Sequence, residues 1–237
     1  MDNSIYTTLT RQSGLMREMQ VVANNIANAA TTGFRQEGVI FSEHVKRLPG
    51  GASLSMASAA VRNTSMIQGN LTQTGGQLDL AIEGDGFFVI ETPQGQRLTR
   101  AGHFSSSAEG ELVTSDGHRV LDIGAAPVFL PPDSLDLAIA SDGTLSAGGV
   151  PLAQIGLVLP VDPLGMIRET GVLFRADAGV EPADSGRILQ GFLETSNVDP
   201  IGQIARMIEV QRAYEMGQSL LEREDERIRT AIKTFIR

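Results

Sequence analysis

Residues 200–236 read PIGQIARMIEVQRAYEMGQSLLEREDERIRTAIKTFI, and this stretch decides the fold. Asp199 is a suitable N-cap, and Pro200 suits the first helical position because a helix leaves that N–H unpaired. Small and apolar residues then recur at alternating steps of three and four, the spacing of a coiled-coil seam. The predicted seam consists of Met207, Val210, Tyr214, Gly217, Leu221, Glu224, Ile228, Ala231 and Phe235. A helix of this extent is roughly 54 Å long at 1.5 Å per residue, too long for one small core to cover.

Gly217 interrupts this seam. A glycine inside a helix costs about 1 kcal/mol relative to alanine. Two interpretations stay open at this point. Either a partner helix approaches closely there, or the helix tolerates a local defect.

A second amphipathic helix is predicted over residues 5–30, with Asp2 as a favourable first-turn residue. Thr31, Thr32 and Gly33 are typical of a helix end. The apolar spacing again follows steps of four and three, through Ile5, Leu9, Gln12, Met16, Met19, Ala23 and Ile26. The two helices can pair antiparallel within one chain, or each can coil against neighbouring subunits. The length mismatch favours neighbours, because the shorter helix leaves part of the longer seam uncovered.

The region between the helices has the pattern of strands and turns. Residues 42–70 are rich in Ser, Ala, Gly and Met, which predicts an extended connector. Beyond Gln77, strict alternation through Leu78, Leu80 and Ile82 indicates a half-buried strand, and repeated acidic-Gly pairs indicate hairpin turns.

The predicted fold class is therefore α+β. The N- and C-terminal helices form a coiled-coil-like stem, and the centre is a β-rich domain of short antiparallel strands. The expected organisation is an N-terminal helix with a motif loop (1–36), an extended connector (37–76), a central β domain (77–196) and a long C-terminal helix (197–237).

Charge and composition exclude several function classes. The 237-residue chain carries a formal net charge of −9, and because both ends are slightly basic, the centre is strongly acidic. Nucleic-acid binding needs a basic face, so none is expected. The chain has no cysteine, which excludes disulfides and thiolate chemistry. No apolar stretch reaches the ~20 residues of a membrane helix, and no secretory signal pattern is visible, so neither membrane insertion nor a cleaved signal peptide is expected.

Candidate chemistry is sparse. His44, His103 and His118 lack metal-ligand spacing, and the serines at 105–107 lack the strand–turn–helix elbow of a nucleophile. The acidic-Gly turns lack the regular oxygen ligands of calcium loops. We therefore expect no catalytic, cofactor-binding or metal-binding residue, no cofactor and no enzyme activity. An enzyme would require a deep pocket converging on His103 or His118 with a perturbed carboxylate.

Particular motifs at both ends and in the centre resemble the bacterial flagellar basal-body rod and hook protein family. They are ANNIAN (23–28) with TTGFR (31–35), LDLAIEGDGFF (78–88), RLTRAGHF (97–104), and SNVDP (196–200) with MIEVQRAYE (207–215). They cover most of the chain and occur in the family's order. Length and the segment around residues 41–49 are most like proximal-rod members.

The resemblance implies a structural subunit that polymerises through its terminal helices into the periplasm-spanning drive shaft. It implies contacts with itself, with other rod subunits and with the type III export apparatus. Alternatives are a distal-rod member and a non-flagellar secreted or phage-type tube protein. The motifs and seams together predict an assembly interface of Ile5, Leu9, Met16, Met19, Asn24, Asn25, Ile26, Asn28, Asn197, Met207, Val210, Gln211, Arg212, Tyr214, Gly217, Leu221, Ile228 and Phe235.

Overall fold

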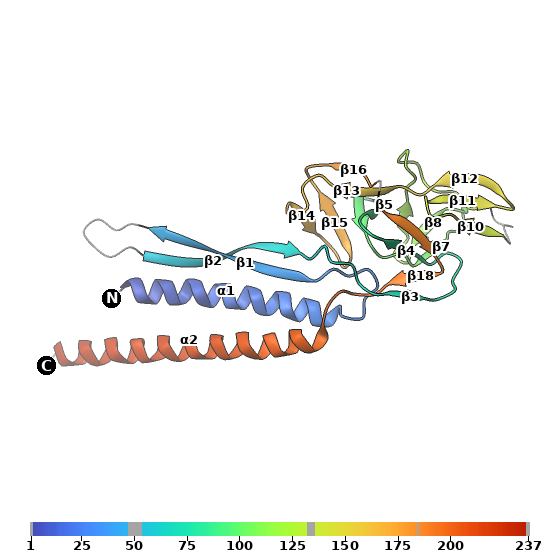
Figure 1. Cartoon of the computed structure of the whole chain (residues 1–237). Coiled ribbons are helices and arrows are strands. Elements are labelled where there is room, and N and C mark those ends of the chain that lie inside the picture. The colour runs from blue at the N-terminus through green and yellow to red at the C-terminus, as the bar shows by residue number, and fades with distance from the viewer. Residues whose placement is uncertain (1, 47–53, 132–135, 184, 236–237) are drawn as a thin grey trace. The chain divides into compact units, whose positions relative to one another are not determined.

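The computed structural model describes residues 2–46, 54–131, 136–183 and 185–235 (Figure 1). The first element of the chain is helix α1 (Asp2–Ala27) and the last is helix α2 (Pro200–Phe235). The strands between them are β1 (Glu37–Lys46), β2 (Leu54–Thr64), β3 (Leu71–Gln73), β4 (Leu80–Glu83), β5 (Phe87–Thr92), β6 (Gly95–Thr99), β7 (Phe104–Ser106), β8 (Leu112–Thr114), β9 (Arg119–Val120), β10 (Leu137–Ile139), β11 (Thr144–Ala147), β12 (Val150–Gln154), β13 (Leu157–Pro160), β14 (Met166–Arg168), β15 (Leu173–Ala176), β16 (Val180–Pro182), β17 (Arg187–Gln190) and β18 (Phe192–Glu194).

The chain divides into two compact units. The helical unit comprises Met1–Ala27, Glu37–Ser65 and Asp199–Arg237, and the β-rich unit comprises Asn28–Gln36 and Met66–Val198. All pairings between strands are antiparallel. The predicted α+β class is confirmed, with a helix at each end and many short antiparallel strands between them. None of the helices in the described ranges is both long and apolar enough to cross a membrane.

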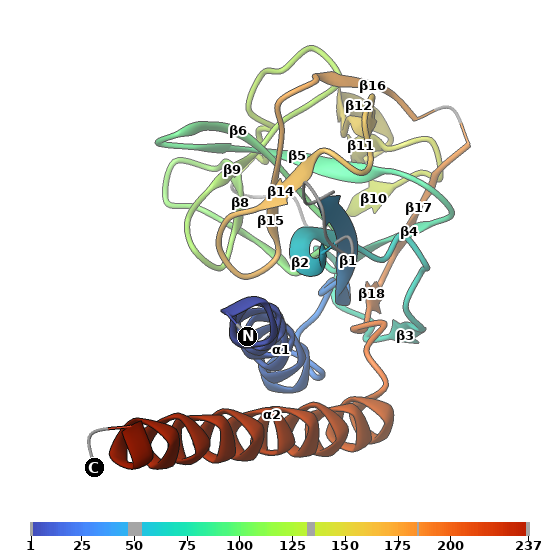
Figure 2. The same ribbon diagram turned by 90° about the vertical axis from the view of Figure 1, so that its left-hand side faces the viewer.

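In the helical unit α1 and α2 lie side by side and run antiparallel. Gln12 of α1 donates a hydrogen bond to the Tyr214 carbonyl 2.8 Å away, and Glu18 pairs with Arg206 at 2.7 Å between Oε1 and Nε. The two views show that the helix axes are inclined to each other (Figures 1 and 2). The within-chain pairing that the length mismatch disfavoured is thus the arrangement found. The difference in helix length has a visible consequence, because the side chains of α2 from Asp225 to Thr234 are exposed.

The remainder of the helical unit is a long β-hairpin, which lies in the region where the sequence predicted an extended connector. β1 pairs with β2 from Glu37↔Thr64 to Lys46↔Leu54, with a register shift between Ile40 and Phe41. The hairpin packs on α1 (Figure 1). Its low-complexity composition hid this order, because strand pairing satisfies the backbone whatever the side chains are.

The β-rich unit contains one large sheet and three smaller ones. The large sheet has nine strands, with the order β14-β15-β6-β5-β9-β8-β7 and with β13 and β16 joined to it through β5. The smaller sheets are β10-β11-β12, β17-β4 and β18-β3. The predicted strand through Leu80 and Ile82 is β4, and it is followed by the buried β5.

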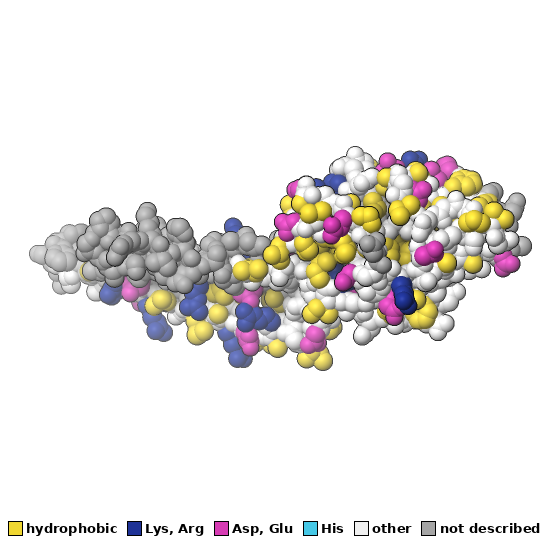
Figure 3. Space-filling view, turned by 45° about the horizontal axis from the view of Figure 1, so that its top comes forward, with side chains coloured by type: hydrophobic (Ala, Val, Ile, Leu, Met, Phe, Trp, Pro, Cys, Tyr) yellow, Lys and Arg dark blue, Asp and Glu magenta, His cyan; other side chains and the backbone are white. Residues whose placement is uncertain are grey.

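Two apolar clusters stabilise this unit. The larger one surrounds Phe88, whose ring meets that of Phe104 edge-on with centroids 5.2 Å apart. The smaller one surrounds Phe87 and Phe174, whose ring centroids are 5.9 Å apart. Because Phe87 and Phe88 are neighbours on β5, their side chains point to opposite faces, which places one cluster on each side of the strand. Apolar side chains on the surface in view lie interspersed with carboxylates (Figure 3), as on an ordinary protein surface.

Gly102 allows the closest backbone contact in this unit. It is buried, and its carbonyl accepts a hydrogen bond of 2.9 Å from the Leu80 amide. A Cβ at position 102 would lie 1.6 Å from the Leu80 carbonyl oxygen. Only glycine fits there, which gives the glycine of the RAGHF motif a structural reason.

We expect Gly102→Ala to destabilise the β-rich unit by about 3 kcal/mol or more, because β4 must move away from residue 102. The measurement is the urea midpoint followed by near-ultraviolet circular dichroism. Gly38→Ala is the control, since a Cβ there would meet only the Asn63 carbonyl oxygen at 3.9 Å. Equal midpoints for the two variants would contradict the steric explanation.

Candidate functional site

A buried ionic cluster lies where the family-like motifs meet in the β-rich unit. Glu194, at the end of β18, places Oε1 3.0 Å from Arg35 Nη2 and Oε2 3.1 Å from Arg100 Nε. All three side chains are buried, with exposed fractions of 1–2%. Arg35 comes from the TTGFR motif and Arg100 from the RLTRAGHF motif. The two basic motif residues therefore share one carboxylate.

The cluster also binds backbone from several segments. Arg100 donates to the carbonyls of Gly86 at 2.8 Å and Gly84 at 2.7 Å. Arg35 donates to the carbonyls of Met66 and Ile67, and the Gly69 amide donates to Glu194 Oε1 at 2.9 Å. Charged hydrogen bonds of this kind are roughly twice as strong as neutral ones. The cluster thus fixes the GDG turn, the segment leading to β3 and the TTGFR segment around one point.

The charges in this cluster are poorly hydrated. Burial lowers the pKa of Arg100 to about 10, against the opposing effect of Glu194, and burial likewise lowers the pKa of Arg35. Arginine side chains are not deprotonated in proteins at neutral pH, so both groups carry a positive charge. The Arg100 Nε and Glu194 Oε2 atoms are close but not aligned for a hydrogen bond, so the pair is chiefly electrostatic. Removing one partner would therefore leave an uncompensated buried charge.

The rest of the TTGFR motif is held by packing. A Cβ on Gly33, whose φ is +69°, would lie 2.3 Å from the Ala101 nitrogen. The guanidinium carbon of Arg168 lies 4.3 Å from the ring centroid of Phe34 and 4.5 Å from that of Phe174. Stacking a cation between two rings contributes about 0.5–2 kcal/mol per ring. The glycine and the phenylalanine of the motif are thus explained within one chain.

Asn197 joins the start and the end of the β-rich unit. Its Oδ1 accepts a hydrogen bond of 2.6 Å from the Gln36 amide, and its Nδ2 donates to the Ile67 carbonyl at 2.7 Å. Gln36 and Asn197 stand close to two of the four points at which the chain passes from one unit to the other. This predicted assembly residue is therefore committed to contacts within the chain.

Asn25 has the corresponding position in the helical unit. It exchanges two hydrogen bonds with the Glu37 backbone, donating to the carbonyl at 2.8 Å and accepting from the amide at 2.9 Å. Its Nδ2 also donates to Gln203 Oε1 of α2 at 3.1 Å. Asn25 is 1% exposed. One amide thus connects α1, the hairpin and α2, and it finds within the chain the partners that a buried amide needs.

The predicted seam of α2 is the face that α1 covers in the single chain. Val210 is 2% exposed, whereas Ile208 on another face of the helix is 45% exposed. Met207, Tyr214, Gly217 and Leu221 are partly buried. Ile228 is 38% exposed, and the Phe235 side chain lies outside the described residues. The prediction of an apolar seam agrees with this burial, but much of the seam is already in use within the chain.

Gly217 allows the close approach of α1. A Cβ there would lie 2.2 Å from Gln12 Nε2, the atom that donates to Tyr214. Of the two interpretations of this glycine, close helix approach is the one that the structure supports. The approaching helix is α1 of the same chain.

The predicted seam of α1 is only partly covered. Leu9 is 49% and Met16 45% exposed, while Met19 and Ile26 are partly buried. The Ile5 side chain lies outside the described residues. The buried side chains of α1 are instead Gln12, Glu18, Val21, Val22 and Asn25. The prediction of one apolar seam does not describe the burial of α1, because this helix packs against both α2 and the hairpin.

The other predicted motif residues have local roles or exposed positions. Asn24 donates to Glu37 Oε2 at 3.4 Å, and Asn28 Oδ1 accepts from the Thr31 hydroxyl at 3.2 Å. Gln211 donates to Glu215 at 3.1 Å, and Arg212 is exposed. Whether any predicted interface residue also contacts another subunit stays a prediction.

Sequence reasoning missed Glu194 and Ile201. The sequence signal for Glu194 is weak. It is a single carboxylate at the end of a short strand that also contains Phe192 and Leu193. Ile201, Ile204 and Ile208 recur at helical spacing beside the predicted seam and are 80%, 50% and 45% exposed. A search for a second apolar stripe on the same helix would have found these isoleucines.

A polar cleft of about 560 Å³ in the β-rich unit is lined in part by His103, His118, Asp116 and Glu169. His103 Nδ1 lies 2.7 Å from Asp79 Oδ1. The imidazole is 64% exposed, so the pair stands at the surface and not in a water-excluding site. Hydrogen bonds from Thr74 and His103 outweigh desolvation and lower the pKa of Asp79, and the Arg97 hydrogen bond lowers the pKa of Glu169. A general base needs a raised pKa, so these carboxylates are shifted in the wrong direction.

The serines near His103 form a loop. Ser107 Oγ accepts hydrogen bonds from the amides of Glu109 at 3.2 Å and Glu111 at 3.1 Å. Across the described ranges, no three His, Asp or Glu side chains are grouped so that they could hold a metal ion.

Replacing Glu194 by glutamine tests the ionic cluster. We expect Glu194→Gln to lower the free energy of unfolding by about 3–5 kcal/mol, because two buried guanidinium groups lose their counter-charge. Urea unfolding measures the loss. The matched control is Glu91→Gln, whose carboxylate is 49% exposed and 3.6 Å from Arg119, for which we expect less than about 1 kcal/mol. A Glu194→Gln loss no larger than the control would refute the role of the cluster.

Replacing Asn25 by alanine tests the junction in the helical unit. We expect about 2–4 kcal/mol of local destabilisation, because the Glu37 amide and carbonyl lose their buried partners. Amide hydrogen exchange at Glu37 should accelerate accordingly. Gln20→Ala, at an exposed position of α1, is the control and should leave this exchange unchanged. Unaltered protection of Glu37 in Asn25→Ala would show that the hairpin start is held by other contacts.

Three segments of the chain match known protein families. Residues 5–35 match the flagella basal body rod protein family, and residues 81–147 match the D1 domain of the flagellar hook protein FlgE/F/G. Residues 189–234 match the C-terminal region of the flagellar basal body rod FlgEFG proteins. These segments contain the motifs whose geometry is described above.

Individual relatives agree over nearly the whole length. The chain is 39% identical to flagellar basal-body rod protein FlgF of Caulobacter vibrioides, covering 98% of each chain. It is 38% identical to FlgF of Mesorhizobium japonicum over 99% of this chain and 98% of the relative. Identity to flagellar basal-body rod protein FlgG of Bacillus subtilis is 32%, over 94% of this chain and 95% of the relative. The chain belongs to the flagellar basal-body rod protein family.

Proposed function

We propose that this chain is a structural subunit of the proximal part of the flagellar rod and polymerises through its terminal helices. The observation that carries the proposal is the near full-length similarity to FlgF proteins at 38–39% identity. Identity to FlgG of Bacillus subtilis is lower, at 32%. A distal-rod role is therefore the second candidate.

The surface of the helical unit supports assembly through helices. Leu9 and Met16 of α1 and Ile201, Ile204 and Ile208 of α2 are all 45–80% exposed. Such side chains on helices mark surfaces that partners cover. Contacts between these faces and those of other rod subunits would bury them. Many such repeated contacts would sum to a stiff shaft that transmits torque.

A structural role is preferred to an enzymatic one because the carboxylates near the histidine-lined cleft are poor bases and the nearby serines form a loop. A phage-type or other secreted tube protein is disfavoured by the matches of the terminal segments to rod families. We further propose export through the flagellar type III apparatus without a cleaved signal, no membrane insertion, and no nucleic-acid binding because the chain is acidic.

Mass spectrometry of purified hook–basal bodies, beside a strain that lacks this chain, tests the proposal. We expect the protein to be present in wild-type basal bodies and rod assembly to stop in the deletion strain. Its absence from pure basal bodies, with motility intact in the deletion strain, would reject a rod role.

Ile228→Asp tests the end of the α2 seam. Ile228 is 38% exposed, so a charge there has little effect on the fold but places an unpaired carboxylate in a contact between subunits. We expect a folded protein whose incorporation into basal bodies falls at least about tenfold, equivalent to 1.4 kcal/mol or more. Quantitative mass spectrometry measures the amount. Ile167→Asp makes the same substitution at a similarly exposed position, 45%, of the β-rich unit and should assemble normally. Normal rods from Ile228→Asp would refute the seam assignment.

A further inference from the structure

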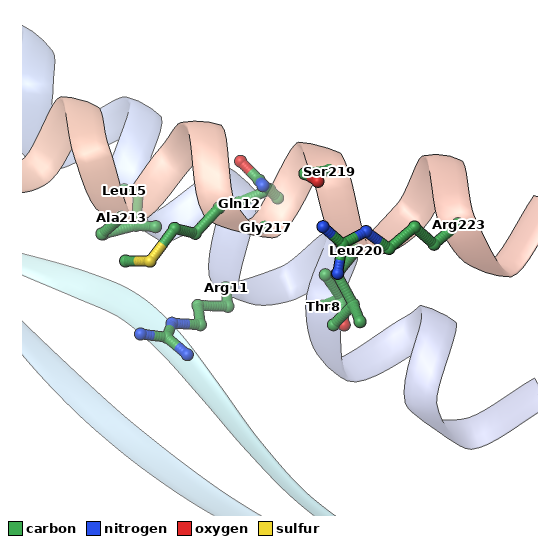
Figure 4. Close-up of a pocket in the computed structure, with 10 residues that line it drawn as sticks. Thr8, Arg11, Gln12, Leu15, Ala213, Gly217, Ser219, Leu220 and Arg223 are labelled. Atoms are coloured by element: carbon green, nitrogen blue, oxygen red, sulfur yellow. The ribbon is translucent and has the colours of Figure 1, made fainter.

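A groove of about 460 Å³ runs between α1 and α2 of the helical unit (Figure 4). Leu15 of α1 and Met216 and Leu220 of α2 supply apolar surface. Met216 is 68% and Leu220 50% exposed, so the single chain leaves this surface largely uncovered. The groove lies beside the contact between the Gln12 side chain and Gly217, both of which line it.

Two arginines give the groove a positive charge. Arg11 lines it from α1 and Arg223 from α2, and in Figure 4 the Arg223 guanidinium lies beside Leu220. Both side chains are exposed, and neither has an ion-pair partner in the part of the chain that the structure describes. The other basic residues of α2 near it, Arg227 and Arg229, pair with Glu224 and Asp225. The groove therefore favours an acidic occupant.

Gln12 lies at the wall of the groove and has a buried acceptor without a donor in the described part of the chain. Gln12 is 9% exposed, and its Oε1 has no hydrogen-bond partner among the described residues, while its Nε2 is occupied by Tyr214. A buried acceptor without a donor costs about 1–3 kcal/mol. Because this oxygen has almost no exposed surface, an occupant of the groove does not reach it, and the two arginines determine which occupant the groove favours.

The chain itself carries a segment of this chemistry. Glu222 and Glu226 are one turn apart on the same face of α2, both are exposed, and neither is ion-paired within the described residues. Like charges at this spacing repel each other by a few tenths of a kcal/mol, so an external cation would relieve them.

We propose that the groove between α1 and α2 receives the acidic face of α2, around Glu222 and Glu226, from a second copy of this chain. Arg11 and Arg223 would pair with the two carboxylates. Since each copy uses a different surface to give and to receive, the contact is heterologous and need not close on itself. This inference rests on the proposed rod function and identifies the surfaces by which copies join.

A charge exchange between two variants tests the pairing in the purified full-length protein. The groove variant carries Arg11→Glu and Arg223→Glu, and the face variant carries Glu222→Arg and Glu226→Arg. Each variant alone juxtaposes like charges. In an equal mixture, the groove of either variant meets a face of opposite charge on the other. Sedimentation velocity over a concentration series measures self-association.

We expect the dissociation constant of each variant alone to rise at least about tenfold over wild type, and the mixture to return towards the wild-type value. Circular dichroism and urea midpoints establish that both variants fold. Arg187→Glu is the control, because Arg187 is an exposed arginine of the β-rich unit without an ion pair in the described ranges. Its association should be unchanged.

Three outcomes would overturn the inference: a wild-type chain that stays monomeric at its highest soluble concentration, variants that associate normally, or variants whose mixture does not recover. The same variants expressed in the deletion strain separate this inference from the proposed function. Wild-type protein in basal bodies together with normal incorporation of the groove variant would retain the rod function and reject the groove pairing. Absence of the wild-type protein from basal bodies would reject the rod function, while sedimentation would still decide the pairing.

Discussion

The β-rich unit depends on the burial of one carboxylate, that of Glu194, between two guanidinium groups. Its exposed fraction of 1% means that water contributes little to its stabilisation, so Arg35, Arg100 and the Gly69 amide must do so. Through these partners the carboxylate determines where the TTGFR segment, the GDG turn and β18 meet. Buried ion pairs add less to stability than apolar packing of the same volume, but they tolerate few alternative arrangements. We interpret this cluster as a device that fixes geometry where the chain enters and leaves the unit.

The helical unit is organised by an amide in place of an ion pair. Asn25 provides two donor contacts and one acceptor contact, which join α1 to the first residue of the hairpin and to α2. This amide and the Gln12–Gly217 contact use the inner faces of both helices, and apolar side chains outside these contacts, such as Leu9 and Met16 of α1, remain exposed. Intramolecular order and intermolecular contact can therefore coexist on the same two helices. The exposed isoleucines at the start of α2 and the charged segment near its end belong to these outer faces.

The sequence allowed the fold class and both helices to be predicted, because heptad-like spacing and strand alternation are local signals. The motifs could also be located from the sequence. Close approach of a partner helix at Gly217 was one of the two interpretations that the sequence left open. The β-hairpin was not foreseen, since its composition has weak periodicity and its order comes from the pairing of two consecutive strands and from packing on α1. The function of Arg35 and Arg100 was equally hidden. Their common partner Glu194 is about 159 and 94 residues away, and only the folded chain brings it between them.

The same distinction bears on the predicted interface, which stays a prediction. Periodicity identifies a face that needs a partner, but it does not say whether that partner is in the same chain. In α2 the answer changes along the helix. Val210 is covered by α1, whereas residues 225–234 extend past it and are exposed. A helix that is partly covered within its own chain and partly exposed has a fixed orientation and a remaining surface that is available to a neighbour. Preorganisation of this kind reduces the entropy lost on association, so that individually weak contacts can add up along a polymer.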